Sequence, residues 1–475
     1  MALATSNLVQ LRYAVESTFG VLPSIGNNNL RMTGESLSFG ITSDTSKEIR
    51  SDRQVSDLVL TGASASGGYN FELSYREHDD FIEAAMMGSW LGANDITIAS
   101  TTITLTNTIT ASAGTPFAGI QIGQTVKFSG FANAANNQPL VVLTVTDTVI
   151  TVSGTPLVNE AAVATTFTSF GVTSGGAHAL TFTSSLFATT PTLTASAGAP
   201  FANVVAGQSI LISGMPTAGN NGLKKIVSKT SNTVIVLASG SFTANEAGAA
   251  AKVSSSRLTN GVTQRSFSME RSMQDIGQSF LYRGMTPSKV DFSFSSGAIV
   301  MGGFDFVGKD SLRANVAGPN YTQLPGTPVA SDTYDVMNAV TGVGNVLENG
   351  AALAGTFIKS LKLTIDNKLR GRTAIGTLGN VSVGAGTFEV KGEIEVYLAD
   401  GAMYDKFINN TASSISFSAQ DGALNGYVFT LPKVKYSDAK VQAGGLDQDV
   451  VISMPFTGLM DPTTGKMLII DRVGV

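Results

Sequence analysis

The chain has no cysteine and only two histidines among its 475 residues. The lack of cysteine excludes disulfides, thiolate metal ligands and cysteine nucleophiles, and two histidines cannot form a multi-histidine metal centre. His78 stands beside Asp79 and Asp80, but no nucleophile accompanies it, so we expect a surface histidine ahead of a helix. We therefore expect neither an enzyme nor a bound cofactor or metal.

Charge is also scarce. Only 14% of the residues are charged, against about 25% in typical soluble proteins, and the net charge is −5. A surface with so few charges tends to be covered by a partner. The negative balance argues against a nucleic-acid-binding surface, which needs basic residues to displace counterions, but it suits a surface that DNA must slide past.

Long apolar segments are missing too. No apolar run reaches the ~18 residues of a membrane span, and the stretch from Met1 to Ser6 lacks a basic region followed by an apolar core. We therefore expect no signal peptide, no membrane insertion, and folding in a cytoplasm.

Repetition is the most informative feature that is present. The stretch ASAGTPFA at 111–118 returns as ASAGAPFA at 195–202, a shift of 84 residues. The two copies predict two small inserted β domains, of sandwich or barrel type, at 94–170 and 178–256. Both ends of the insert should meet the host at one place. The modules either decorate an outer surface or bind glycans through many weak contacts, and the lack of an aromatic cluster favours decoration.

A fainter duplication surrounds this insert. Alternating apolar and polar residues at 69–75 and 388–396 predict half-buried strands. Short helices are predicted at 79–87, where two aspartates precede an apolar run, and at 403–408. The fold class is therefore mainly β. The expected boundaries are 1–93 with 257–312 for a discontinuous first domain, 313–356 for a linker, and 357–475 for a second domain.

Several host segments resemble the tail tube proteins of long, flexible-tailed (siphovirus-type) bacteriophages. They are LRMTGESL at 30–37, EIRSDRQ at 48–54, GGYNFELSY at 67–75, RSFSME at 265–270, FLYRGM at 280–285 and GGFDFVG at 302–308. The resemblance implies two β-sandwich domains of the tail tube type, each with a short helix. It also implies a ring whose inner sheets join into a barrel, and a tube of stacked rings through which the genome leaves.

Most rings of this family hold six subunits, and some related phages fuse two tube domains and use three chains. The duplication here resembles that case, which implies a homotrimer forming a pseudo-hexameric ring in the virion. The implied partners are other copies of the chain, the tape measure protein and DNA in the lumen, and the tail terminator and tail tip proteins.

Two groups of polar residues gain possible roles from this resemblance. The polar strand faces carry Asn70, Glu72, Glu393 and Glu395, which we expect to line the lumen and repel DNA phosphates. The loops that carry Lys47, Glu48, Arg50, Asp52 and Arg53, and Lys368, Arg370 and Arg372, are expected to contact the next ring. The plainer alternatives are a solvated strand face and ordinary soluble loops.

Two other classes of function remain open. A secreted bacterial β-repeat adhesin or surface filament would be β-rich as well, but it would need a secretion signal and repeats in tandem. A β-rich hydrolase is disfavoured because no acid–base constellation is evident. Rings or tubes of purified protein would separate the structural role from both alternatives.

Overall fold

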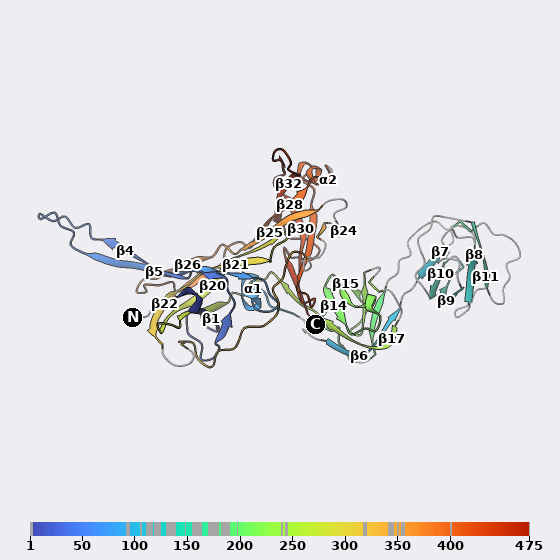
Figure 1. Ribbon diagram of the computed structural model, residues 1–475, viewed down its shortest axis with the longest axis horizontal. Helices are drawn as coiled ribbons and strands as arrows, with labels where there is room; N and C mark the ends of the chain where they lie inside the picture. The colour runs from blue at the N-terminus through green and yellow to red at the C-terminus, as the bar shows by residue number, and fades with distance from the viewer. Residues whose placement is uncertain are drawn as a thin grey trace. The chain divides into compact units, whose positions relative to one another are not determined.

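The protein is mainly β, as the alternation predicts, and it has two α-helices in the part of the chain described here (Figure 1). The computed structural model describes residues 3–91, 96–104, 107–110, 117, 125–129, 139–147, 149–153, 164–169, 180–181, 191–196, 198–238, 241–242, 246–316, 321–340, 346–348, 351–352, 357–399 and 401–474. The chain divides into two compact units, one of Met1–Leu91 with Ser256–Gly474 and one of Gly92–Ser255.

The larger unit contains one sheet that runs through both halves of the duplication, called the long sheet below. Its neighbouring strands are, in order, β4 (Ser38–Thr45), β5 (Leu58–Glu72), β21 (Met301–Val307), β20 (Gln278–Ser295), β25 (Ile358–Asp366), β28 (Glu389–Tyr397), β32 (Val450–Gly458) and β31 (Lys440–Ala443). The short β3 (Gly34–Glu35) precedes β4 and also pairs with β5.

Each half adds a covering sheet. The first consists of β2 (Asn28–Leu30), β1 (Val9–Glu16), β19 (Ser266–Met273), the N-terminal part of β20, and β22 (Asp310–Asn315). The second consists of β24 (Ala351–Ala352), β23 (Leu347–Glu348), β29 (Ser413–Gln420), β30 (Gly426–Tyr436), β33 (Ile469–Val473) and β18 (Ser256–Thr259). The first covering sheet and the part of the long sheet that it covers are called the first sandwich below. The second covering sheet and its part of the long sheet are called the second sandwich. A separate hairpin joins β26 (Arg370–Arg372) to β27 (Ser382–Gly384), and a 3-10 turn spans Ser6–Leu8.

One long strand passes from the covering sheet to the long sheet in each half. In β20, Gln278–Arg283 pair with β22, whereas Thr286–Ser293 pair with β21. Gly284 lies at the change with φ +69°, and a Cβ there would come within 2.8 Å of the Phe19 ring, so the bend requires glycine. Strand β30 makes the same passage, from β33 to β32. This shared irregularity supports the outer duplication.

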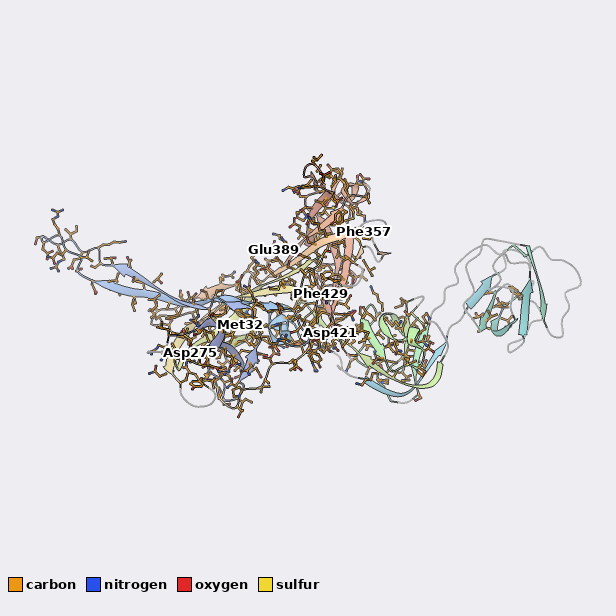
Figure 2. The ribbon with its side chains drawn as sticks, in the orientation of Figure 1. Met32, Asp275, Phe357, Glu389, Asp421 and Phe429 are labelled. Atoms are coloured by element: carbon orange, nitrogen blue, oxygen red, sulfur yellow. The ribbon has the colours of Figure 1, made fainter. Side chains whose placement is uncertain are left out.

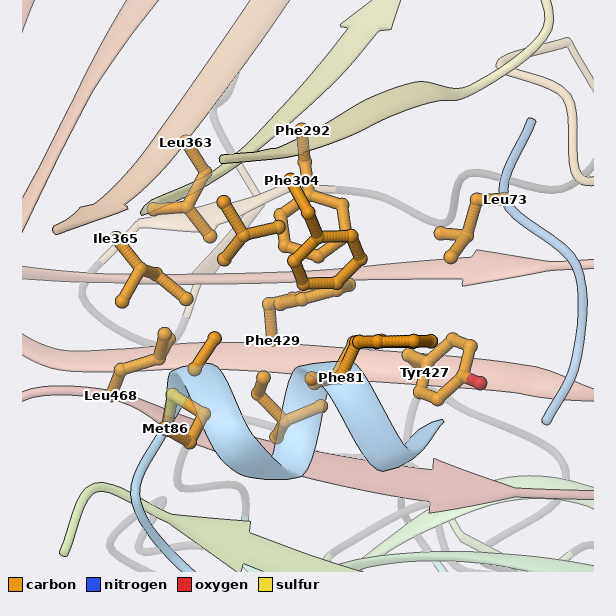
Figure 3. Close-up of a cluster of buried hydrophobic side chains, with 14 of the residues drawn as sticks. Leu73, Phe81, Met86, Phe292, Phe304, Leu363, Ile365, Tyr427, Phe429 and Leu468 are labelled. Atoms are coloured by element: carbon orange, nitrogen blue, oxygen red, sulfur yellow. The ribbon is translucent and has the colours of Figure 1, made fainter. Parts of the chain in front are cut away.

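The helices of the two halves differ in burial. Helix α1 (Asp79–Ala85) buries Phe81 and Ile82 completely, and the Phe81 ring centroid lies 4.5 Å from that of Phe267. Helix α2 (Ala402–Ile408) instead leaves Tyr404 and Ile408 exposed. Figure 3 shows α1 within a cluster of apolar side chains that come from both sandwiches.

His78 is a core residue, so the expectation of a surface histidine is wrong. Its side chain is 0% exposed, and its ring centroid lies 4.1 Å from that of Phe71. The ring nitrogen Nδ1 lies 3.3 Å from the hydroxyl of Tyr69. Burial lowers the pKa of His78 to about 3, because the cation would lose its hydration. The turn after β5 folds back on that strand, which the residue types around His78 do not reveal.

The inserted unit contains a closed barrel and a six-stranded sheet. The barrel consists of β13 (Thr192–Ala195), β16 (Val234–Leu237), β15 (Gly222–Lys229), β14 (Ser209–Ser213), β17 (Glu246–Ser254) and β6 (Ile96–Thr104), with a 3-10 turn at Ala218–Asn220. The sheet consists of β12 (Leu180–Thr181), β11 (Ala164–Ser169), β8 (Thr125–Ser129), β9 (Pro139–Val145), β10 (Val149–Ser153) and β7 (Asn107–Thr110).

Strand pairing in the insert differs from the order expected of two consecutive modules. Strand β6 precedes the first sequence copy but pairs with β13 and β17, whereas β12 precedes the second copy but pairs with β11. Along the chain, the segment that forms the six-stranded sheet therefore lies between β6 and β13, the first two strands of the barrel. Because β6 and β17 are the first and last strands of the insert and pair antiparallel, the insert leaves the host and returns beside its own start.

The segment expected as a linker also takes part in the fold. Strand β22 overlaps its start, and β23 near its end pairs with β29. Between them, Met337 is completely buried. Its main-chain N–H donates a hydrogen bond of 2.8 Å to the carbonyl of Leu73, and its carbonyl accepts one of 2.9 Å from the N–H of Val300. Proline and glycine make this segment irregular, but they do not stop an apolar side chain from filling the core.

Candidate functional site

The continuity of the long sheet depends on one strand pair between the two sandwiches, called the joint below. Strands β20 and β25 pair antiparallel from Lys289 opposite Asp366 to Ser295 opposite Ser360. Main-chain hydrogen bonds therefore continue from the first sandwich into the second. This pairing joins two duplicated domains into one continuous sheet, with one common polar face and one common apolar face.

Aromatic side chains of the first sandwich enter the core of the second at this joint. The ring centroids of Phe292 and Phe429 lie 5.3 Å apart, and those of Phe294 and Phe417 lie 5.0 Å apart in an edge-on arrangement. Phe292 and Phe294 are almost completely buried. Burial of one such side chain contributes about 1.5–3 kcal/mol, so the joint is a core rather than a loose contact.

Helix α1 adds a buried polar contact to the joint. Asp79 forms an ion pair with Arg472 and accepts a hydrogen bond of 2.6 Å from the hydroxyl of Tyr427. Asn367 of the second sandwich donates a hydrogen bond of 2.8 Å to the carbonyl of Ala85. Burial lowers the pKa of Arg472 to about 10. The ion pair offsets the cost of burying these charges, so it specifies the geometry of the joint.

A second ion pair binds the C-terminal strand to the strand that follows the insert. Arg257 of β18 donates two hydrogen bonds, of 2.6 and 2.8 Å, to the carboxylate of Asp471 on β33. Such bidentate pairs are geometrically specific. They hold β33 between β18 and β30.

The four residues expected to line the lumen lie on the same, polar face of the long sheet. Asn70 and Glu72 project from β5, where the adjacent Phe71 is buried, and Glu393 and Glu395 project from β28. The joint places all four on one sheet, in two separate groups. Glu395 pairs with Lys359 at 3.0 Å, and Glu393 accepts a hydrogen bond from Ser453.

Lysines share this face with the carboxylates, and the sequence analysis did not predict them there. Lys289 pairs with Asp291 at 2.6 Å, and Lys368 pairs with Asp366 at 2.6 Å and with Glu389 at 2.9 Å. Glu389, labelled in Figure 2, also pairs with Lys391. Hydrogen bonds from Lys391 and Lys368 lower the pKa of Glu389. The alternation that indicated Glu393 and Glu395 also contains Lys391, so the presence of lysine on this face could have been predicted from the sequence.

The first charged loop lies at the tip of a long hairpin, called the arm below (residues 38–65). Its residues Lys47, Glu48, Arg50, Asp52 and Arg53 are exposed, and Arg50 pairs with Asp52 at 2.9 Å. Ile41, Ile49 and Val59 on the arm are also exposed. Exposed apolar side chains of this kind are common on interaction surfaces.

The second charged loop is separate from the first and lies on the hairpin of β26 and β27. Arg370 and Arg372 are exposed in β26, and Lys368 precedes it. The same hairpin contacts the first sandwich, because Asn380 donates a hydrogen bond of 2.7 Å to the carbonyl of Gly308. Leu378 accepts one of 2.8 Å from the main chain of Ala63. The sequence reading missed this contact.

Two further observations bear on the class of protein. Among the described residues, no three side chains of His, Asp or Glu come together to hold a metal ion. No helix in the described ranges has the length and apolar character needed to cross a membrane. Two β-sandwiches fused through one continuous sheet define a mainly β protein with a duplicated domain.

Comparison with known proteins identifies the family. The family model described as phage tail tube protein matches residues 6–260 and again residues 231–458. The two matches cover most of the chain, so the chain belongs to the phage tail tube protein family, and the double match is consistent with two fused tube domains. No curated protein matches the chain.

Replacement of Asp79 by alanine should destabilise the chain by about 3–5 kcal/mol, because it removes the carboxylate that pairs with buried Arg472. Tyr427→Phe removes the hydrogen bond to the same carboxylate and the one that the hydroxyl accepts from the Arg76 main-chain N–H, and should cost about 1–3 kcal/mol. Urea denaturation of unassembled protein measures both losses.

Asp52→Ala is the control, since it breaks an exposed ion pair and should leave the denaturation midpoint unchanged. A loss from Asp79→Ala no larger than that from Tyr427→Phe would contradict the assigned role of the ion pair.

Proposed function

We propose that this chain is the structural subunit of a long, flexible phage tail, in which three copies close a pseudo-hexameric ring and stacked rings conduct DNA during ejection. The observation that carries this proposal is the joint, where β20 and β25 continue one sheet through both sandwiches. The role is structural rather than catalytic. The tube lies in the virion after assembly in the host cytoplasm, with the tape measure protein in its lumen and the terminator and tip proteins at its ends.

Ring closure follows from repetition of this joint. A head-to-tail contact that is repeated with a constant rotation closes into a ring when the rotations complete a full turn without a shift along the axis, and otherwise forms an open helix. Closure also removes exposed sheet edges, which would otherwise bind other strands without control. Because each chain supplies two sandwiches, a ring of six sandwiches needs three chains.

The polar face of the long sheet is the proposed lumen surface. It carries Asn70, Glu72, Glu393 and Glu395 together with lysines that pair with neighbouring carboxylates. Paired charges reduce the attraction of lysines for phosphate, and the remaining carboxylates repel it. DNA can therefore pass without adhering.

The arm is the proposed contact between rings. Its tip carries charges of both signs at Lys47, Glu48, Arg50, Asp52 and Arg53, and its strands carry exposed apolar side chains. Lys368, Arg370 and Arg372 form the corresponding charged group of the second sandwich. Complementary charges would set the rotation of each ring on the next.

Electron microscopy of purified protein tests the proposed function. Rings or tubes should form, with three pairs of protrusions per ring from the inserted unit. Native mass spectrometry of isolated rings should count three chains. Six chains per ring, or particles that stay monomeric, would contradict the proposal.

The double substitution Glu393→Lys with Glu395→Lys should slow DNA ejection roughly tenfold while tubes remain intact, since cations on the lumen surface would bind phosphate. Release of DNA from complemented phage particles, followed by dye fluorescence, measures the rate. Glu393→Gln with Glu395→Gln is the matched control for loss of charge alone and should have a smaller effect. An unchanged rate of ejection in the lysine variant would contradict the proposal that this face lines the lumen.

Alanine at both Arg50 and Arg53 should leave rings intact but shorten tubes, because cations are lost from the arm tip. Tube length distributions in electron micrographs measure the effect, and high salt should reduce the difference from the parent protein. Lys225→Ala, an exposed cation of the inserted unit, is the control. Tubes of normal length from the arm variant would exclude these arginines from stacking.

A further inference from the structure

The duplication assigns each strand residue of the first sandwich a counterpart in the second. In the first sandwich, Glu72 lies opposite Met301 and Ser66 lies opposite Val307. In the second, Tyr397 lies opposite Val451 and Lys391 lies opposite Thr457. Met301 therefore corresponds to Val451, and Glu72 corresponds to Tyr397.

The same comparison extends to the strand at each outer edge of the long sheet. On one flank, Gly34 faces Asn70 and Ser38 faces Ser66, as Ser360 faces Glu395 and Thr364 faces Lys391. Residues 34–38 therefore correspond to 360–364 of β25.

On the other flank, Ser293 of β20 faces Met301, and Gln442 of β31 faces Val451. Likewise, Asp291 faces Gly303, and Lys440 faces Ser453. Residues 440–442 of β31 thus correspond to 291–293 of β20, the strand that forms the joint.

We propose that residues 34–38 of one copy pair antiparallel with residues 440–444 of the next copy, in the register of the joint within one chain. Within the chain, Ser293 faces Lys362 and Asp291 faces Thr364. Between copies, Gln442 then faces Ser36, and Lys440 faces Ser38. This register rests on the proposed ring and names the strands that close it.

The exposure of apolar side chains supports a second copy of the chain as the partner at both edges. Ile365 and Phe292 at the joint are 0% and 1% exposed, whereas their counterparts Phe39 and Val441 are 37% and 49% exposed. Helix α1 is buried at the joint, and α2 leaves Tyr404 and Ile408 uncovered. A second copy, seated as the two halves are seated, would bury all four exposed side chains.

Space is available beside Gly34 and Glu35, at one end of the edge that would receive β31. A groove of about 910 Å³ is lined by residues 6–11 and 30–35 with Gln274. Within the described part of the chain, no strand pairs with the outer side of residues 34–38, and none pairs with the outer side of β31.

Side chains cap the receiving edge in the single chain. The main-chain N–H of Leu37 donates to Glu35 at 2.8 Å, and its carbonyl accepts from Arg271 and Tyr282, each at 3.3 Å. Glu35 and Arg271 also form an ion pair at 2.9 Å. The incoming strand replaces these bonds with main-chain bonds, so the cap protects the edge of an unassembled copy.

Paired cysteines test this register directly, since the chain has no cysteine of its own. Ser36→Cys with Gln442→Cys, oxidised in assembled tubes, should give covalent dimers and trimers in a non-reducing gel, with no larger species. Opposite residues in a strand pair have Cα atoms about 4.5–5.5 Å apart, within disulfide range.

Two control pairs complete the experiment. Ser36→Cys with Lys440→Cys shifts the register by two residues, or about 6.6 Å, and should cross-link at least about fivefold less. Ser293→Cys with Lys362→Cys reproduces the joint and should form a disulfide within one chain.

The outcomes separate the register from the proposed function. Tubes that form but give only monomers with Ser36→Cys and Gln442→Cys would overturn the register. Equal cross-linking of the shifted pair would overturn it as well, and a ladder beyond three chains would overturn ring closure by three copies. A parent protein that forms no rings or tubes would instead contradict the proposed function.

Discussion

The pairing of β20 with β25 is the constraint on which the rest of the larger unit depends. Main-chain hydrogen bonds give this joint its direction and register, and Phe292 and Phe294 fix it further by entering the neighbouring core. A slip of one residue would turn both phenylalanines to the polar face and the charged residues to the core. This strand pair therefore places the charged faces of the two halves on the same side of the long sheet.

The covalent chain makes one joint different from any joint between copies. Helix α1 begins with Asp79, whose carboxylate pairs with buried Arg472 inside the chain. Asp405 in the first turn of α2 is exposed in the single chain. Breaking a buried pair is costly, so the internal pair holds the two sandwiches together before any second copy is bound.

The sequence predicted which face of each strand is buried, but not which strands are neighbours. Alternation around Phe71 and Ile394 is local, so the mainly β fold and the two polar faces could be read from it. Pairing partners are not local: β6 joins β17 across the whole insert, and repeat spacing favours the nearer copy. The burial of His78, the contact from Asn380 and the cap at Leu37 likewise depend on segments that meet only after folding.

The polar face shows why charge pattern matters more than net charge. A purely acidic wall would repel DNA, but it would also repel itself, since neighbouring carboxylates would lie opposite one another across the sheet. Lysine at 289, 359 and 391 pairs with adjacent carboxylates and relieves this repulsion. Each lysine is thereby occupied by a carboxylate and offers less of its charge to phosphate. In the proposed tube, the same ion pairs would reduce both the repulsion within the sheet and the attraction of its lysines for DNA phosphates.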